Sequence, residues 1–249
     1  MTGRPAKIGD VTDSVTNSVT NPVAGVLVLA ATPIGDPADA SPRLAREITT
    51  ATMVAAEDTR RFSRLCHFLE VRASGPVVSY HEHNEATRTA DLLARLLEGA
   101  RVLVVTDAGM PSVSDPGYRL VVAAVEAGVR VTCVPGPSAV LMALAVSGLP
   151  VDRFCFEGFP SRKAGERLRS FQALARERRT LIFFEAPHRL AVALAAMADA
   201  LGDDDRAPGS YQRFKAREVA RWEGDRFEIS EEDIRQIVAG LERDRGRSR

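Results

Sequence analysis

Residues 101–119, RVLVVTDAGMPSVSDPGYR, decide the fold that we expect. They begin with an apolar run and continue into a loop that holds two aspartates, two glycines, two prolines and two serines. A short apolar run bounded by turn residues is typical of a strand that is buried on both faces. Since an amphipathic segment follows, we expect a strand, a long loop and a helix, which is the repeating unit of an α/β protein.

The same alternation continues on both sides of this unit. We expect strands at residues 26–32, 51–56, 77–81, 101–107, 129–135, 153–157 and 180–185, and helices at 41–50, 84–98, 117–127, 163–178 and 188–201. Gly99 and Gly128 each follow the last apolar position of a helix, where a left-handed C-cap costs glycine least. The pattern predicts an α/β fold with a mostly parallel sheet.

Composition shifts divide the chain into four parts. Proline and glycine at 135–137 and 148–150 place a domain boundary within residues 136–150. We therefore expect a disordered tail at 1–24, an N-terminal domain at 25–140, a C-terminal domain at 141–202 and a divergent segment at 203–249. In the last segment the pattern predicts one helix, beginning after Ser230, and no core strand.

Bulk composition excludes several classes of protein. With 45% hydrophobic residues the chain is too apolar to be wholly disordered, and 33 basic against 33 acidic residues exclude a uniformly basic nucleic-acid coat. Three separated cysteines favour a reducing compartment. Because we find neither a secretory signature nor a run near the roughly 18 apolar residues of a membrane span, we expect a cytoplasmic protein without a membrane segment.

Polar clusters follow several of the expected strands. Asp107 and Asp115, in the loop that opened this section, could accept hydrogen bonds from a ligand ammonium or hydroxyl group. Further clusters are EDTRR at 57–61, HEHNE at 81–85, PGPSA at 135–139 and EAPHR at 185–189. No metal is expected, because the two histidines of HEHNE lack further ligands at a suitable spacing. Helix caps and solvated loops stay open as the ordinary alternative for each cluster.

Residues 162–179 carry seven basic side chains and two acidic ones, a net charge of +5 on an expected helix. A charged run is usually a solvated helix face. This imbalance of sign also fits contact with a phosphate backbone.

Seven motifs, in this order, resemble those of the small-subunit ribosomal RNA methyltransferase I family, within the tetrapyrrole methylase superfamily. They are ATPIGD (31–36), AAEDTRR (55–61), SYHEHNE (79–85), TDAGMPSVSDPGYRLV (106–121), PGPSA (135–139), SGLPVDRFCFEGFPSRK (147–163) and FFEAPHRL (183–190). The resemblance implies two α/β domains, each a mixed sheet flanked by helices. Residues 203–249 depart from the family pattern, so an incomplete second domain is left open.

The resemblance also implies a function. A homodimer would bind S-adenosylmethionine between its domains and methylate a cytidine 2′-hydroxyl of 16S rRNA in the small ribosomal subunit. The implied cofactor residues are Asp107, Gly109, Pro111, Ser114, Asp115, Ser138, Ala139, Ala186 and Pro187, and the implied RNA contacts are Arg60, Arg61, Arg162, Lys163, Arg167 and Arg169.

A ribose hydroxyl is a weak nucleophile, so a base near it would speed the transfer. The candidates for this catalytic base are Glu57, Asp58, His81 and Glu82. Two alternatives to rRNA methylation stay open. One is a methylase of a corrinoid or other tetrapyrrole precursor, and the other is a non-catalytic binder of RNA or cofactor with a disrupted C-terminus.

Overall fold

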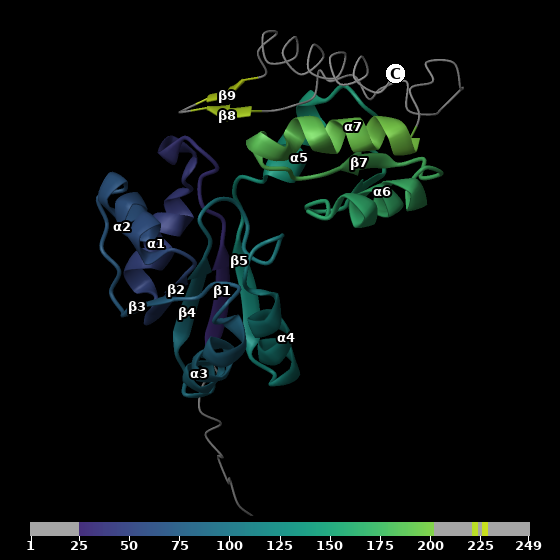
Figure 1. Ribbon diagram of the computed structural model, residues 1–249. Helices are drawn as coiled ribbons and strands as arrows, with labels where there is room; N and C mark the ends of the chain where they lie inside the picture. The colour runs from purple at the N-terminus through teal and green to yellow at the C-terminus, as the bar shows by residue number, and fades with distance from the viewer. Residues whose placement is uncertain (1–24, 202–220, 224–225, 229–249) are drawn as a thin grey trace, which may run out of the picture.

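A five-stranded parallel sheet organises the first half of the chain (Figure 1). The computed structural model describes residues 25–201, 221–223 and 226–228. The strands lie in the order β3-β2-β4-β1-β5, and every neighbouring pair is parallel. Their bounds are β1 Val26–Ala30, β2 Met53–Ala56, β3 Val77–Ser79, β4 Arg101–Val105 and β5 Arg130–Val134.

Helices cover both faces of this sheet, because successive side chains of a strand point to opposite sides. The helices are α1 Pro42–Thr50, α2 Thr59–Phe68, α3 Glu85–Leu97 and α4 Tyr118–Glu126, with a short 3₁₀ helix η1 at Pro37–Asp39. Val28 and Leu103 face α1 and α2, whereas Leu27 and Val102 face α3 and α4. The result is a three-layer sandwich whose central strands are buried on both sides.

The expected helix ends are confirmed at two glycines. Gly99 follows α3 with a φ of +94°, and Gly128 follows α4 with a φ of +71°. Both values lie in the left-handed region that glycine adopts without steric cost. Glycine at these positions therefore lets each helix stop and the chain turn into the next strand.

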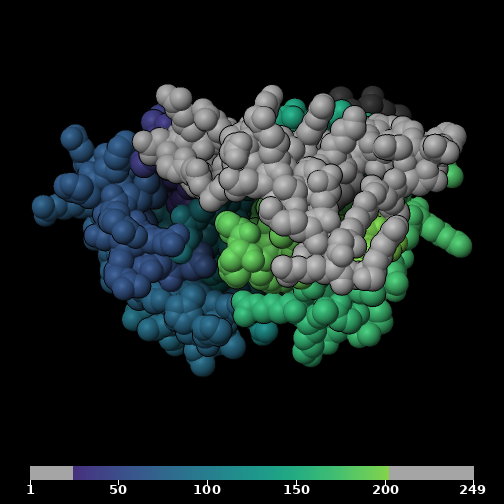
Figure 2. Space-filling view, turned by 45° about the horizontal axis from the view of Figure 1, so that its top comes forward, coloured from purple at the N-terminus to yellow at the C-terminus, as the bar shows by residue number. Residues whose placement is uncertain are grey.

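A second group of elements follows in residues 139–201. It comprises α5 Ala139–Val146, β6 Phe154–Phe156, α6 Ala164–Ala173, β7 Thr180–Ile182, η2 Pro187–Arg189 and α7 Leu190–Leu201. β6 and β7 pair in parallel. Ile182 packs against α5, while Phe171 of α6 packs against α7. In the space-filling view these residues form the green body beside the blue body of the first sheet (Figure 2).

Several expectations need correction. The described strands of the first sheet are all parallel rather than mixed, because a helix intervenes between each strand and the next along the chain. Helix α2 was not expected, and α6 ends at Ala173 instead of residue 178. The expected strand at 180–185 ends at Ile182, where the Phe184 N–H turns to bond the carbonyl of Gly158 (2.9 Å).

The C-terminal segment also differs from expectation. An antiparallel hairpin of β8 Arg221–Glu223 and β9 Arg226–Glu228 lies where no strand was expected. The helix expected after Ser230 and the tail at 1–24 lie outside the described residues. Within the described ranges, no helix has the length and apolar character that crossing a membrane requires.

Candidate active site

Loops from three strands converge on Gly109 at the carboxyl edge of the five-stranded sheet. Thr32 and Gly109 exchange backbone hydrogen bonds of 3.0 and 3.1 Å, which ties the loop after β4 to the end of β1. Gly109 has a φ of +81°, and a Cβ atom on it would lie 3.4 Å from Ile34 Cγ2 and 3.7 Å from the Pro137 carbonyl oxygen. Backbone from β1, β4 and β5 therefore meets where parallel sheets usually place their ligands.

Three carboxylates gather beside this point: Glu57 after β2, and Asp107 and Asp115 after β4. The Asp107 N–H donates to Glu57 Oε2 (3.0 Å), and the Asp58 N–H donates to Asp107 Oδ1 (3.2 Å). Arg61 Nε lies 3.3 Å from Asp107 Oδ2. These reciprocal contacts lock the two loops together and hold two of the three carboxylates in place.

We call Glu57, Asp107 and Asp115 the carboxylate cluster. Two of its members have pKa values above those of ordinary carboxyl groups. Burial raises the pKa of Asp115 to about 7, and the negative charges of Glu57 and Asp107 contribute to that rise. Burial also raises the pKa of Glu57, although the hydrogen bond from Asp107 opposes this. Arg61 is the one cation paired with the cluster among the described residues, so the negative charge of the three carboxylates is only partly neutralised and suits a positively charged ligand.

Asp58, one of the four candidate bases, lies at the start of helix α2. It is the N-cap of α2, and its Oδ1 accepts the backbone N–H groups of Arg60 (2.8 Å) and Arg61 (3.3 Å). Arg60 Nη2 also lies 3.2 Å from its Oδ2. These hydrogen bonds lower the pKa of Asp58 to about 2. Asp58 therefore serves as the N-cap of α2, and its carboxylate is a weaker base than an ordinary aspartate.

The strand expected at 77–81 ends at Ser79, so His81 and Glu82 lie in the turn that leads to α3. The His81 N–H donates to Asn84 Oδ1 (2.8 Å), and Asn84 Nδ2 donates to the Ser79 carbonyl (3.1 Å). His81 Nδ1 is buried without a hydrogen-bond partner among the described residues, whereas Glu82 is exposed. The described part of the chain contains no group of three or more His, Cys, Asp or Glu side chains placed to hold a metal.

Four further predicted cofactor residues follow two other strands, Ser138 and Ala139 after β5 and Ala186 and Pro187 after β7. Ser138 is the N-cap of α5, but its hydroxyl makes no capping bond within the described residues, so its expected capping role is not seen. Ala139 begins α5, and Ala186 precedes Pro187 at the start of η2. A Cβ atom on Gly158 would lie 3.8 Å from Ser114 Oγ, so the loop after β6 approaches the loop after β4.

The predicted RNA contacts divide between the surface and the interior. Arg60, Arg162, Lys163 and Arg169 are exposed, and the Arg61 side chain is 57% exposed. Arg167 contradicts the expectation, because it is only 7% exposed and its Nη1 donates to the carbonyls of Ser161 (3.2 Å) and Arg162 (3.4 Å). Arg167 fastens the start of α6 instead of presenting its charge to a ligand.

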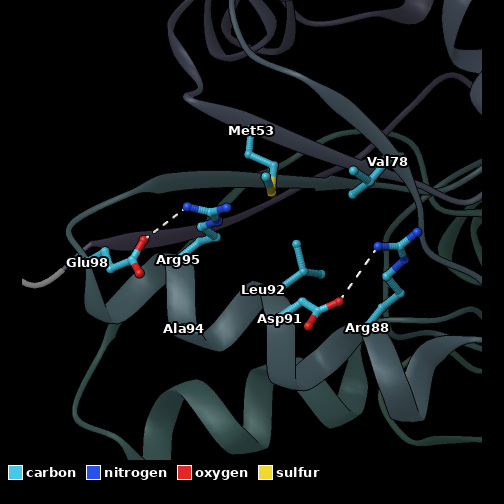
Figure 3. A pocket seen from close by; sticks show the side chains of 8 residues that line it. All are labelled: Met53, Val78, Arg88, Asp91, Leu92, Ala94, Arg95 and Glu98. Carbon is cyan, nitrogen blue, oxygen red and sulfur yellow. Dashed lines mark hydrogen bonds and ion pairs between the residues drawn. The ribbon is translucent and has the colours of Figure 1, made fainter.

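A surface hollow of about 380 Å³ lies elsewhere, between α3 and strands β2 and β3 (Figure 3). Leu92 and Met53 line it, and the pairs Arg88–Asp91 (3.7 Å) and Arg95–Glu98 (3.2 Å) stand on α3 beside it. The hollow contains none of the predicted site residues. We therefore place the candidate site at the carboxylate cluster.

Comparison with known proteins identifies the family of the chain. Residues 26–211 match the family described as Tetrapyrrole (Corrin/Porphyrin) Methylases. The chain belongs to the tetrapyrrole methylase family. Residues 185–240 also match a family of unknown function, DUF6166. This second match includes part of the segment where the sequence departs from the resemblance described above.

The relatives of this tetrapyrrole methylase include proteins named Ribosomal RNA small subunit methyltransferase I. The one from Mycobacterium tuberculosis is 55% identical over 179 residues, which are 72% of this chain and 63% of that protein. The one from Pseudomonas aeruginosa is 46% identical over 199 residues, 80% of this chain and 70% of that protein. The chain thus spans less than two thirds of the length of its M. tuberculosis relative.

Solved structures of low identity share the fold. A diphthine synthase superposes with a TM-score of 0.54 at 17% identity, covering 70% of this chain and 71% of that chain. The methyltransferase CobJ has a TM-score of 0.53 at 21% identity, with 71% and 76% covered. The α/β fold expected from the sequence is therefore confirmed.

Sequence reasoning missed Glu85, whose carboxylate joins α3 to the loop of this tetrapyrrole methylase that carries Asp115. A signal was present, because Glu85 closes the HEHNE cluster. This position in the sequence did not predict which residue Glu85 contacts, because Gly117 lies 32 residues further along the chain.

Proposed function

We propose that this chain is an S-adenosylmethionine-dependent methyltransferase that acts on a cytidine ribose 2′-hydroxyl of 16S rRNA in the small ribosomal subunit. The carboxylate cluster at the carboxyl edge of the sheet is the observation that carries the proposal. The names of the relatives supply the class of reaction and the kind of acceptor.

The residues present fit S-adenosylmethionine. That cofactor carries a positive sulfonium and an ammonium group, and the negative charges of Glu57, Asp107 and Asp115 complement them. Gly109 brings backbone close to the ligand position without a side chain in the way. When bound, the cofactor supplies the methyl group. Ser114, Ser138, Ala139, Ala186, Pro111 and Pro187 are proposed to line the same site.

Among the four candidate bases, we favour Glu57. Its pKa is raised by burial, so its carboxylate is a stronger base than an exposed glutamate and would accept the proton of a ribose hydroxyl more readily. His81, whose Nδ1 has no partner among the described residues, is the second candidate. The protein's further contribution is alignment, because in-line transfer depends on holding the acceptor oxygen opposite the leaving sulfur.

Exposed arginines give the proposed site a surface for RNA. Arg60 and Arg61 stand beside the carboxylate cluster, and Arg162, Lys163 and Arg169 stand at α6. Guanidinium groups suit phosphate because they bind it with paired hydrogen bonds. We further propose that the chain works in the cytoplasm as a homodimer, with domains at 25–140 and 141–202. The family resemblance supports that assembly.

Methyl transfer from labelled S-adenosylmethionine to 30S subunits that lack this modification tests the proposal. Transfer to a single cytidine 2′-hydroxyl is expected, and transfer to a tetrapyrrole precursor instead would overturn it. Cofactor binding without transfer to either acceptor would identify a non-catalytic binder.

The base is identified by the variants Glu57→Gln, Asp58→Asn, His81→Asn and Glu82→Gln. We expect Glu57→Gln to lower kcat at saturating S-adenosylmethionine by about 10²-fold or more. Its affinity for the cofactor, measured by titration calorimetry, should also fall, because the carboxylate cluster loses one negative charge. Glu98→Gln, at an exposed pair on α3, is the matched control and should retain full activity. Full activity of Glu57→Gln would reject it as the base.

A further inference from the structure

Glu85 is the first residue of α3, yet its carboxylate accepts hydrogen bonds from the N-terminal end of another helix, α4. Its Oε1 accepts the backbone N–H groups of Gly117 (3.0 Å) and Arg119 (3.3 Å), and Tyr80 Oη also donates to it (3.2 Å). Arg119 Nε lies 3.6 Å from its Oε2. The Glu85 side chain is 12% exposed, so these contacts replace most of its water.

Helix α4 needs this carboxylate, because its own N-cap has no side chain. The N-cap is Gly117, which leaves the first N–H groups of the helix without a local acceptor. Glycine is required there, since φ is +135° and a Cβ atom would lie 2.6 Å from Ser112 Oγ. Glu85 therefore caps α4 from outside, and its negative charge suits the positive end of the helix dipole.

The loop that α4 follows is held in an uncommon conformation. Ser112 and Ser114 have φ values of +72° and +61°, and the Ser112 N–H closes a turn onto the Pro116 carbonyl (3.2 Å). Left-handed conformations at residues other than glycine cost free energy and persist only when their surroundings fix them. At one end the loop is fixed by the Thr32–Gly109 bridge, and at the other end Glu85 fixes it.

We propose that Glu85 is a positioning residue for the methyltransferase site. Its carboxylate accepts hydrogen bonds from Gly117 and Arg119 and so fixes the conformation of the loop at 110–117. In that conformation Ser114 and Asp115 face the cofactor position beside Glu57. This inference rests on the proposed function, and Glu85 itself does not touch the reacting atoms.

Two variants of Glu85 test the proposal against the control Glu98→Ala. Glu85→Ala removes the acceptor, whereas Glu85→Gln keeps one oxygen for the two N–H groups but loses the charge. We expect Glu85→Ala to speed amide hydrogen exchange at Gly117 and Arg119 and to weaken binding of S-adenosylmethionine about tenfold or more. Its kcat at saturating cofactor should change less than threefold. Glu85→Gln should exchange at an intermediate rate and bind within about threefold of the parent chain.

Unchanged exchange and unchanged cofactor affinity in Glu85→Ala would overturn the proposal. If that variant does not fold, Glu85→Gln decides the matter. The proposal expects an intermediate exchange rate at Arg119 in this variant, and wild-type exchange would overturn the part of the proposal that assigns the charge of Glu85 to holding this end of the loop. If the parent chain binds no S-adenosylmethionine, the proposed function fails. The exchange comparison, which needs no cofactor, then still decides whether Glu85 holds the loop.

Discussion

Asp115 lies between Ser114, whose φ is +61°, and Pro116, whose ring restricts its own φ. Its backbone therefore has little freedom, and its carboxyl is held near the charges of Glu57 and Asp107. Burial is the main reason that its pKa rises to about 7, into the range where a small change of pH changes its charge.

Affinity for S-adenosylmethionine should rise with pH because of Asp115. Below pH 7 the carboxyl is largely protonated, and above pH 7 it carries the negative charge that a cationic ligand prefers. From a pKa of about 7, the dissociation constant should fall about tenfold between pH 6 and pH 8. Titration calorimetry on the parent chain and on Asp115→Asn checks this, since the variant should lose the dependence. Equal pH dependence in both would exclude Asp115 as its source.

The same group should make the unliganded protein less stable as pH rises. In the folded state the pKa of Asp115 is about 7, whereas in the unfolded chain the carboxyl releases its proton near the ordinary value of 3.8. The folded state therefore binds more protons between these values, and its stability falls as pH rises through that window. Thermal melts from pH 4 to pH 8 should show a flatter curve for Asp115→Asn.

The basic residues in helix α6 and just before it divide between the surface and the interior. Arg162 and Arg169 are exposed, while Arg167 is buried and fastens the backbone at the start of the helix. Lys163 is partly neutralised, because its Nζ lies 2.9 Å from Glu166. Under the proposed function, the exposed arginines are therefore the ones that would contact a phosphate backbone.

Binding to 30S subunits should distinguish these two roles. Arg162→Ala and Arg169→Ala should each weaken binding and make its dependence on salt less steep, by a slope of about 0.7 to 0.9 for each phosphate that the variant no longer neutralises. Arg167→Ala should instead lower the melting temperature, because the carbonyls that it caps lose their donor. A filter-binding series at increasing salt concentration measures the slopes. An unchanged slope in both surface variants would remove α6 from the RNA interface.

Features of the fold that depend on neighbouring residues in the sequence could be predicted, whereas contacts between distant residues could not. The central strands were predicted well because an apolar run is a local pattern, and the glycine helix ends have the same basis. Helix α2 was missed even though Asp58 is its N-cap, because the run of arginines after it resembles a polar loop. The hydrogen bond from Gly117 to Glu85 could not be predicted, since it depends on how α3 and α4 pack.

The two groups of elements approach each other near the candidate site. The first sheet supplies every member of the carboxylate cluster, and the loop after β6 reaches Ser114 through Gly158. Within the described residues, the sheet of the second group has two strands. A ligand that bound both groups would therefore strengthen the folded state as a whole.

S-adenosylmethionine should accordingly raise the melting temperature of the chain. A ligand at about 100 times its dissociation constant stabilises the folded state by about 2.7 kcal/mol. S-adenosylhomocysteine lacks the positive charge on sulfur, so the carboxylate cluster should give it less stabilisation at equal concentration. Differential scanning calorimetry with each ligand tests both statements. Absence of any shift with S-adenosylmethionine would contradict the proposed cofactor.

The strand order of the first sheet also affects how the chain folds during its synthesis. β1 is the first strand of the sheet to leave the ribosome, but its two neighbours are β4 and β5, which pair with Val26 at Arg101 and Arg130. During synthesis about a hundred further residues must be added before both edges of strand β1, the apolar run VLVLA, can pair with neighbouring strands. Newly made chains should thus depend on chaperones that bind exposed apolar segments, and slower translation before residue 134 should increase aggregation.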